Sequence, residues 1–240
     1  MNESIARLST GIRSMYGGDA AGQSVANSIG AKGASYAVAA RNAEDGISYL
    51  QAAESLLLEM AALTTRLREL GIQYGNEALL TLTDQAALNA ESAAIGSAID
   101  GIADNVKFNG VALVGTATAI EIGINDAGDT ATIGAATSIA IANTDKITGA
   151  SGVDASADTA LGEIAKSLGN VAAGMSAMKG YQAVANVTAA NLKAAAARIQ
   201  DTDYALETAN LTKAAILNQS AMAMVAQANQ AQQAILSVIQ

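Results

Sequence analysis

The chain has 240 residues, a formal net charge of −9, and neither Cys nor His. The acidic balance argues against nucleic acid as a partner, because phosphate binding needs a surplus of Lys and Arg. Without Cys and His the usual zinc sites, Cys nucleophiles and His general bases are excluded. We therefore expect no enzyme, no metal site and no cofactor.

Most of the apolar residues are Ala: hydrophobic residues make up 51% of the chain, aromatic residues only 3%, and Pro is absent. Ala-rich faces let helices pack closely, and no Pro interrupts them. The composition predicts a mainly α fold, a long antiparallel rod of three to four helices with coiled-coil-like packing. No apolar run is long enough to span a bilayer, and no signal-peptide pattern begins the chain. A membrane is not an expected partner.

The N-terminal segment, residues 1–19, is predicted to hold a short helix over residues 2–15 followed by a linker. Gly17 and Gly18 would break this helix. Asp19 is a candidate N-cap for the next helix, because its carboxylate can accept hydrogen bonds from the free amides of the first turn.

Residues 20–74 are predicted to form the main helix, which stops at Gly75 and Asn76. From Leu56 to Tyr74 its apolar residues follow a heptad pattern, which keeps one stripe facing a partner helix. A second stripe is rotated from the first, so we expect neighbours on more than one side. The predicted core residues of this helix are Leu56, Met60, Leu63 and Leu67.

A second helix is predicted over residues 83–104, with Thr83 as its cap, turning back antiparallel to the first. The pair Asn109-Gly110 between apolar flanks indicates a tight hairpin. Alternation over residues 119–133 indicates another small hairpin. Residues 135–159 are predicted to be irregular and exposed, and residues 115–159 to form a short β-hairpin and variable region.

The second long helix is predicted to begin at Leu161 and to end before residues 201–203, which can cap the next helix. Its heptad stripe makes it the expected partner of the main helix, so that residues 20–114 and 160–200 together form the rod core. The predicted core residues of this second helix are Ile164, Leu168, Val171 and Met175.

The last segment, residues 201–240, carries an apolar stripe in heptad steps and no charge after Lys213. Such a stripe at a chain end would be exposed in a monomer, which predicts a partner. The stripe includes Leu217, Met224, Ala228, Ile235 and Val238.

Several motifs, in order and at both ends of the chain, resemble those of bacterial flagellin. None of these motifs is specific for the family by itself, but their order along the chain is. The motifs are Arg7-Leu8-Ser9-Thr10-Gly11, Arg41-Asn42-Ala43-Glu44-Asp45-Gly46-Ile47-Ser48, Arg66-Leu67-Arg68-Glu69-Leu70, Phe108-Asn109-Gly110-Val111, Ala197-Arg198-Ile199-Gln200-Asp201 and Ala226-Gln227-Ala228-Asn229-Gln230.

The resemblance implies a self-assembling, homo-oligomeric subunit of the extracellular flagellar filament, which serves motility and is exported unfolded by the flagellar type III route. It also implies an export chaperone that binds the C-terminal helix. Family members usually have a further helix before the position of Met1, so we expect residues 1–19 to be a remnant and the C-terminal stripe to be uncovered.

The resemblance assigns a contact surface to Arg66, Leu70 and Glu91. These residues match the surface that the vertebrate Toll-like flagellin receptor binds, and that surface also packs against neighbouring subunits. Two alternatives remain open, a hook–filament junction protein and a cell-surface flagellin homologue that binds polysaccharide. Against the second, one Phe and no Trp leave little for stacking on sugars.

Overall fold

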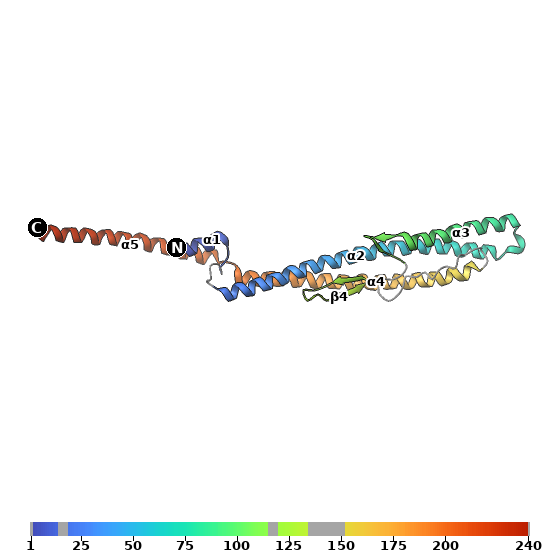
Figure 1. Ribbon diagram of the computed structural model, residues 1–240, viewed down its shortest axis with the longest axis horizontal. Helices are drawn as coiled ribbons and strands as arrows, with labels where there is room; N and C mark the ends of the chain where they lie inside the picture. The colour runs from blue at the N-terminus through green and yellow to red at the C-terminus, as the bar shows by residue number, and fades with distance from the viewer. Residues whose placement is uncertain (1, 14–18, 115–119, 134–151, 240) are drawn as a thin grey trace. The chain divides into compact units, whose positions relative to one another are not determined.

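The computed structural model describes residues 2–13, 19–114, 120–133 and 152–239. Its elements, in order, are α1 (Asn2–Thr10), α2 (Ala20–Tyr74), a 3-10 turn η2 (Glu77–Leu79), α3 (Leu82–Asn105), the strands β1 (Lys107–Phe108), β2 (Val111–Ala112), β3 (Ile120–Gly123) and β4 (Thr130–Ile133), then α4 (Val153–Gln200) and α5 (Tyr204–Ile239). The predicted mainly α fold with small hairpins in the middle of the chain is confirmed (Figure 1).

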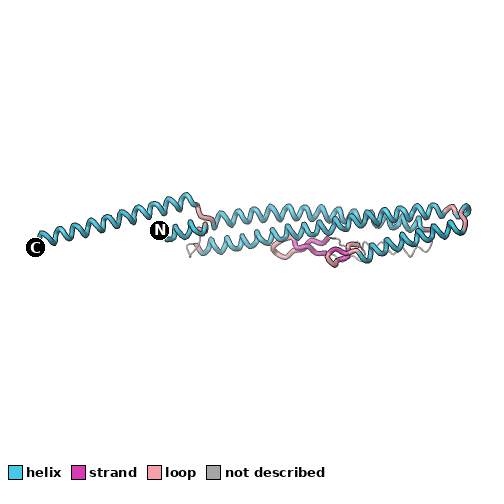
Figure 2. Tube along the Cα trace, turned by 90° about the horizontal axis from the view of Figure 1, so that it is seen from above, coloured by secondary structure: helices cyan, strands magenta, loops and turns pink. Residues whose placement is uncertain are grey.

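The chain divides into two compact units, residues Met1–Ala34 with Ala190–Gln240, and residues Ser35–Ala189. In the second unit, α2 lies antiparallel to both α3 and α4 (Figure 2). Arg66 of α2 contacts Glu91 of α3. Arg68 contacts Asp158, whereas Glu44, earlier in α2, contacts Gln182, later in α4. These crossed pairs require opposite helix directions.

One continuous apolar core joins α2, α3 and α4 in the second unit. The predicted residues Met60, Leu67, Ile164 and Val171 are almost completely buried in it. The other four predicted core residues are partly buried against the same cluster: Leu56, Leu63, Leu168 and Met175. Burial of these stripes supplies most of the stability that long Ala-rich helices lack on their own.

The two hairpins pack on one face of α2. The Tyr49 hydroxyl donates to the Ala112 carbonyl of β2 at 2.8 Å, and the Asn42 amide donates to the Gly123 carbonyl of β3 at 3.3 Å. Gly46 lies between them, with room for side chains of the second hairpin. Residues 42, 46 and 49 are spaced by four and three, so they share a face of the helix.

The hairpin at Asn109-Gly110 is confirmed. Both residues have positive φ angles, 49° and 83°, as a two-residue turn that follows strand twist requires. β1 pairs with β2 and β3 with β4, each antiparallel.

Three predicted helix boundaries are wrong. α1 ends at Thr10 and not at Met15, because Gly11 takes a left-handed φ of 71°. The N-cap of α3 is Thr81, not Thr83; its side chain and that of Asp84 exchange hydrogen bonds with each other's backbone. The breaker pair Gly17 and Gly18 lies outside the described residues.

The third correction concerns α4, which begins at Val153 and not at Leu161. Residues 153–159 are therefore helical, not irregular. Val153, Ala157 and Ala160 are buried, and they extend the apolar stripe backwards from Ile164 in steps of four, three and four. Burial of these small apolar residues favours the helix over residues 153–160, although the Ser, Thr and Asp residues between them favour turns and loops. Residues 134–151 of the predicted variable region lie outside the described part.

Candidate functional site

The α5 helix exposes large apolar side chains to solvent. Asp203 begins the helix as its N-cap, accepting hydrogen bonds from the amides of Ala205 and Leu206. Leu217 is 60% and Met224 is 73% exposed, and Ala228 is exposed as well. The side chains of Ile235 and Val238 lie outside the described residues. An apolar helix face of this kind offers a surface for another helix and no catalytic group.

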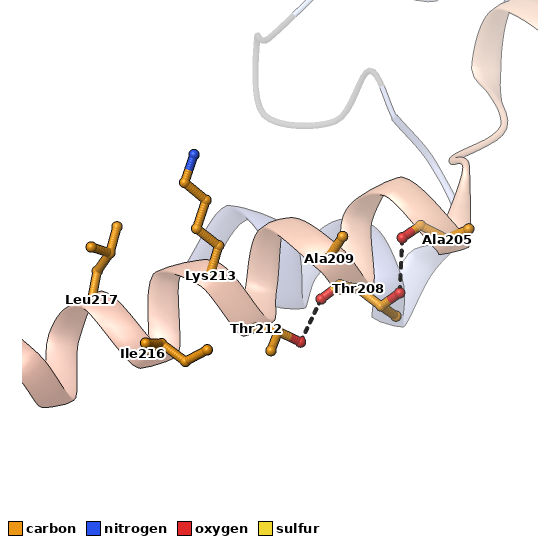
Figure 3. Close-up of a pocket in the computed structure, with 7 residues that line it drawn as sticks. All are labelled: Ala205, Thr208, Ala209, Thr212, Lys213, Ile216 and Leu217. Atoms are coloured by element: carbon orange, nitrogen blue, oxygen red, sulfur yellow. Dashed lines mark hydrogen bonds between the residues drawn. The ribbon is translucent and has the colours of Figure 1, made fainter.

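A groove of about 590 Å³ lies along the first turns of α5 (Figure 3). Its threonine hydroxyls are satisfied within the helix, because Thr208 donates to the Tyr204 carbonyl and Thr212 donates to the Thr208 carbonyl, each at 2.8 Å. Lys213 is the one charged lining residue, so the groove suits a mainly apolar ligand surface. The lining is completed by Ala205, Ala209, Ile216 and Leu217.

The start of α5 is held against α1 and the preceding linkers. The Thr202 amide donates to the Gly11 carbonyl at 2.9 Å, and the Arg13 amide donates to the Gln200 carbonyl at 2.8 Å. The Arg13 guanidinium also donates to the carbonyl of Ile199, at 3.0 Å. This last contact satisfies a carbonyl at the C-terminal end of α4, where helices leave four carbonyls unpaired. Residues 11–13 and 199–202 thus form a joint held by backbone and side-chain hydrogen bonds.

Arg7 of α1 and Glu207 of α5 lie 3.9 Å apart, with Glu207 only 7% exposed. The ion pair and the linker bonds fix α1 on the first turns of α5. From Ile216 to Ala234, every side chain of α5 is exposed.

Arg66 and Glu91 form the centre of an exposed charged surface on α2 and α3. Arg66 Nε and Nη2 donate to Glu91 Oε1 at 2.9 and 2.7 Å, and Nη1 donates to Glu69 Oε2 at 3.1 Å. The hydrogen bond that Arg66 donates to Glu91 and, second to it, the one that it donates to Glu69 raise the pKa of Arg66 above its usual value. Because two carboxylates flank it, the guanidinium is held in one orientation.

Leu70 lies beneath this surface. Its side chain is completely buried and packs with Leu88 of α3. Of the three residues assigned to the contact surface, only Arg66 and Glu91 are accessible to a partner; Leu70 fixes the spacing of α2 and α3 below them.

The described residues hold no group of three Cys, His, Asp or Glu side chains placed to bind a metal ion. In the same part of the chain, no helix is long and apolar enough to cross a bilayer. Sequence reasoning missed two exposed apolar surfaces, Leu79 and Leu82 at the α2–α3 turn and Tyr181, Val184 and Val187 on α4. A heptad pattern does not show whether a single apolar residue is exposed.

Comparison with known proteins covers nearly the whole chain. The family described as the bacterial flagellin N-terminal helical region matches residues 1–118, and the bacterial flagellin C-terminal helical region matches residues 155–239. Flagellin FlaB2 of Treponema pallidum and the flagellar filament 33 kDa core protein of Treponema phagedenis are each 31% identical over 100% of this chain and 92% of their own length. A flagellin of Halalkalibacterium halodurans is 33% identical over 97% of this chain and 89% of its own.

Proposed function

The chain belongs to the bacterial flagellin family and is a structural, non-enzymatic subunit of the extracellular flagellar filament. We propose that α5 is the helix whose apolar side chains become buried when subunits assemble. The observation that supports this most strongly is the exposure of Leu217 and Met224, at 60% and 73%. Removing such side chains from water favours association by roughly 25 cal/mol per Å² of apolar surface, before the costs of ordering.

A pair of matched charge substitutions tests this role of α5. Leu217→Glu places a carboxylate on the apolar stripe, whereas Gln219→Glu adds the same charge about 200° around the helix. We expect the first variant to lose filaments in electron microscopy and pelleting assays, and the second to keep them. Equal assembly of both variants would remove α5 from the proposal.

We also propose that, before assembly, the same stripe of α5 is held by the export chaperone of the flagellar type III route. An exposed apolar helix is an aggregation hazard until it is covered. Co-purification with a flagellin export chaperone should be lost in Leu217→Glu and retained in Arg66→Ala, which lies outside α5. Retention by both variants would place the chaperone elsewhere on the chain.

The exposed pair Arg66 and Glu91 is proposed to contact neighbouring subunits and the Toll-like flagellin receptor, with Leu70 supporting the surface from below. The accessible guanidinium, oriented by two carboxylates, supports this assignment. Receptor signalling by monomers should fall in Arg66→Ala and in Glu91→Ala. Arg68→Ala is the matched control, because Arg68 is a neighbouring exposed arginine that pairs instead with Asp158. An equal loss of signalling in all three variants would contradict the assignment of this surface to Arg66 and Glu91.

A further inference from the structure

Two methionines of α5 carry thioether groups that are open to solvent. Met222 is 68% and Met224 is 73% exposed, whereas Met60 and Met178 are no more than 1% exposed in the apolar core. Met175 is partly buried against the same core. A dissolved oxidant therefore reaches the two α5 methionines, and packing protects the methionines of the core.

Met222 and Met224 lie on opposite faces of α5. Successive residues of an α-helix are about 100° apart, so a step of two residues turns the side chain by about 200°. Met224 follows Leu217 by two turns and lies within about 20° of it, on the apolar stripe. Met222 lies about 140° from Leu217, outside the stripe. One methionine thus belongs to the surface that assembly is proposed to bury, and the other does not.

The two methionines have similar surroundings within the helix. Each is flanked in sequence by Ala or Val, and no charged residue follows Lys213. Their exposed fractions are also close. We therefore expect both thioethers to react with an oxidant at similar rates in the monomer. A different effect of oxidation at the two positions would then come from the face of the helix, so Met222 is an internal control for Met224.

Hydrogen peroxide converts a thioether into a sulfoxide. A sulfur lone pair attacks one peroxide oxygen, the O–O bond breaks, and the other oxygen leaves as water after taking up the proton of the first. The sulfur loses two electrons and the peroxide gains them. Sulfoxide reductases restore the thioether. The chain has no Cys whose thiol would react with peroxide as well.

A sulfoxide at Met224 opposes burial of the apolar stripe. Its oxygen accepts hydrogen bonds from water, and removing a polar group from water without replacing its hydrogen bonds is unfavourable. A sulfoxide at Met222, outside the stripe, keeps its hydration. In a filament, burial of the stripe would also shield Met224 from peroxide, so the reaction acts on free subunits.

We propose that Met224 is a reversible oxidation site at which a peroxide controls whether a free subunit assembles. A subunit oxidised at Met224 does not join a filament, whereas a subunit oxidised at Met222 joins normally. Reduction of the Met224 sulfoxide restores assembly. This inference rests on the proposed function, because it takes the α5 stripe as the surface that assembly buries.

Partition of partly oxidised subunits between filaments and solution tests the proposal without any substitution. Monomers are treated with hydrogen peroxide until both α5 methionines are partly converted, the peroxide is removed with catalase, and the subunits are assembled and centrifuged. Fragment mass spectrometry gives the sulfoxide fraction at each methionine in pellet and supernatant. We expect Met224 sulfoxide to be several-fold depleted from the pellet and Met222 sulfoxide to be equally frequent in both. Sulfoxide reductase should restore assembly of the supernatant.

Two single substitutions separate the methionines in the same assay. Met222→Leu lies outside the stripe, so it should assemble as the unsubstituted chain does and should lose assembly after peroxide treatment. Met224→Leu is compared only with itself, and peroxide should leave its assembly unchanged. Both variants keep the other methionines of the chain, so oxidation elsewhere would affect them alike. If Met224→Leu forms no filaments even before treatment, the partition of the unsubstituted chain decides.

Two results overturn the inference. Equal fractions of Met224 sulfoxide in pellet and supernatant show that oxidation at this position does not hinder assembly. Equal depletion of both sulfoxides from the pellet shows that the effect is not specific to the stripe. In either case the proposed function stands if Leu217→Glu still abolishes filaments. If Leu217→Glu assembles normally, the proposed function fails, and this inference fails with it.

Discussion

Gly71 of α2 lies directly against the backbone of Asp154, in the first turn of α4. A Cβ atom added at Gly71 would lie 2.6 Å from the Asp154 amide nitrogen, closer than real Cβ contacts allow. One residue of α2 thus sets how closely the N-terminal end of α4 can approach, and the Arg68–Asp158 ion pair holds the next turn.

Gly71→Ala should therefore destabilise the chain by about 1–3 kcal/mol, because the clash is with backbone and overpacking outweighs the helix propensity gained. Gly162→Ala is the matched control, since a Cβ there meets nothing within 4 Å, and it should stabilise by up to ~1 kcal/mol. Urea unfolding followed by circular dichroism measures both. Two stabilised variants would contradict the close approach.

Thr81→Ala should reduce stability by about 1 kcal/mol at pH 7, because the capping box at the start of α3 is lost. Thr83→Ala, two residues later, should have a much smaller effect. The comparison distinguishes the cap seen in the structure from the cap that the sequence suggests; the reverse order of effects would favour Thr83.

The Thr81 cap should also depend on pH. Hydrogen bonds from the Thr81 hydroxyl and amide lower the pKa of Asp84. A lowered folded-state pKa adds stability above the unfolded pKa, near 4, and this contribution is lost as pH falls through the lower folded value. The stability difference between the unsubstituted chain and Thr81→Ala should therefore shrink below about pH 4. A difference that grows on acidification would contradict this sign.

Gly11→Ala should loosen the joint between α1 and α5. Gly11 has a φ of 71°, and a Cβ there would lie 3.0 Å from the Tyr204 hydroxyl. A non-glycine residue in this conformation costs roughly 1–2 kcal/mol. Amide exchange at Arg13 and Thr202, whose N–H groups bridge the two linkers, should become faster. In Gly30→Ala, a helix position with open space, exchange at these amides should not change.

Tyr49→Phe should weaken the attachment of the first hairpin to α2 without disturbing the helical core. The substitution removes the bond to the Ala112 carbonyl and keeps the edge-to-face contact with Phe108, whose ring centroid is 6.0 Å away. We expect a loss of about 0.5–1.5 kcal/mol. Tyr181→Phe, a change in a side chain that is 40% exposed, should not alter stability. Equal losses of stability in the two variants would show that the hydrogen bond to Ala112 contributes nothing of its own.

The sequence predicted the main helices and the core well, because heptad spacing determines which side chains face a partner helix. It predicted the hairpin at Asn109-Gly110 for a similar reason, since few residues tolerate two positive φ angles. Helix ends were harder to predict. Thr81 and Thr83 both have a capping side chain, and only the reciprocal bond with Asp84 distinguishes them.

Accessibility at the candidate surfaces could not be read from motifs. Leu70 belongs to a motif shared with flagellins, yet its side chain is buried while Arg66 is exposed. Leu79 and Leu82, in contrast, belong to none of the flagellin-like motifs, and their exposure depends on how the chain turns from α2 into α3. Tertiary packing decides both cases.

Methionine oxidation, measured by mass spectrometry in monomers and in filaments, tests the central claim that α5 is buried by assembly. Met222 and Met224 of α5 are 68% and 73% exposed, whereas Met60 and Met178 are buried in the core and serve as internal controls. We predict that peroxide oxidises Met224 readily in monomers and many-fold more slowly in filaments, while both core methionines resist oxidation in each state. Equal oxidation of Met224 in monomers and in intact filaments would contradict the assembly role of α5.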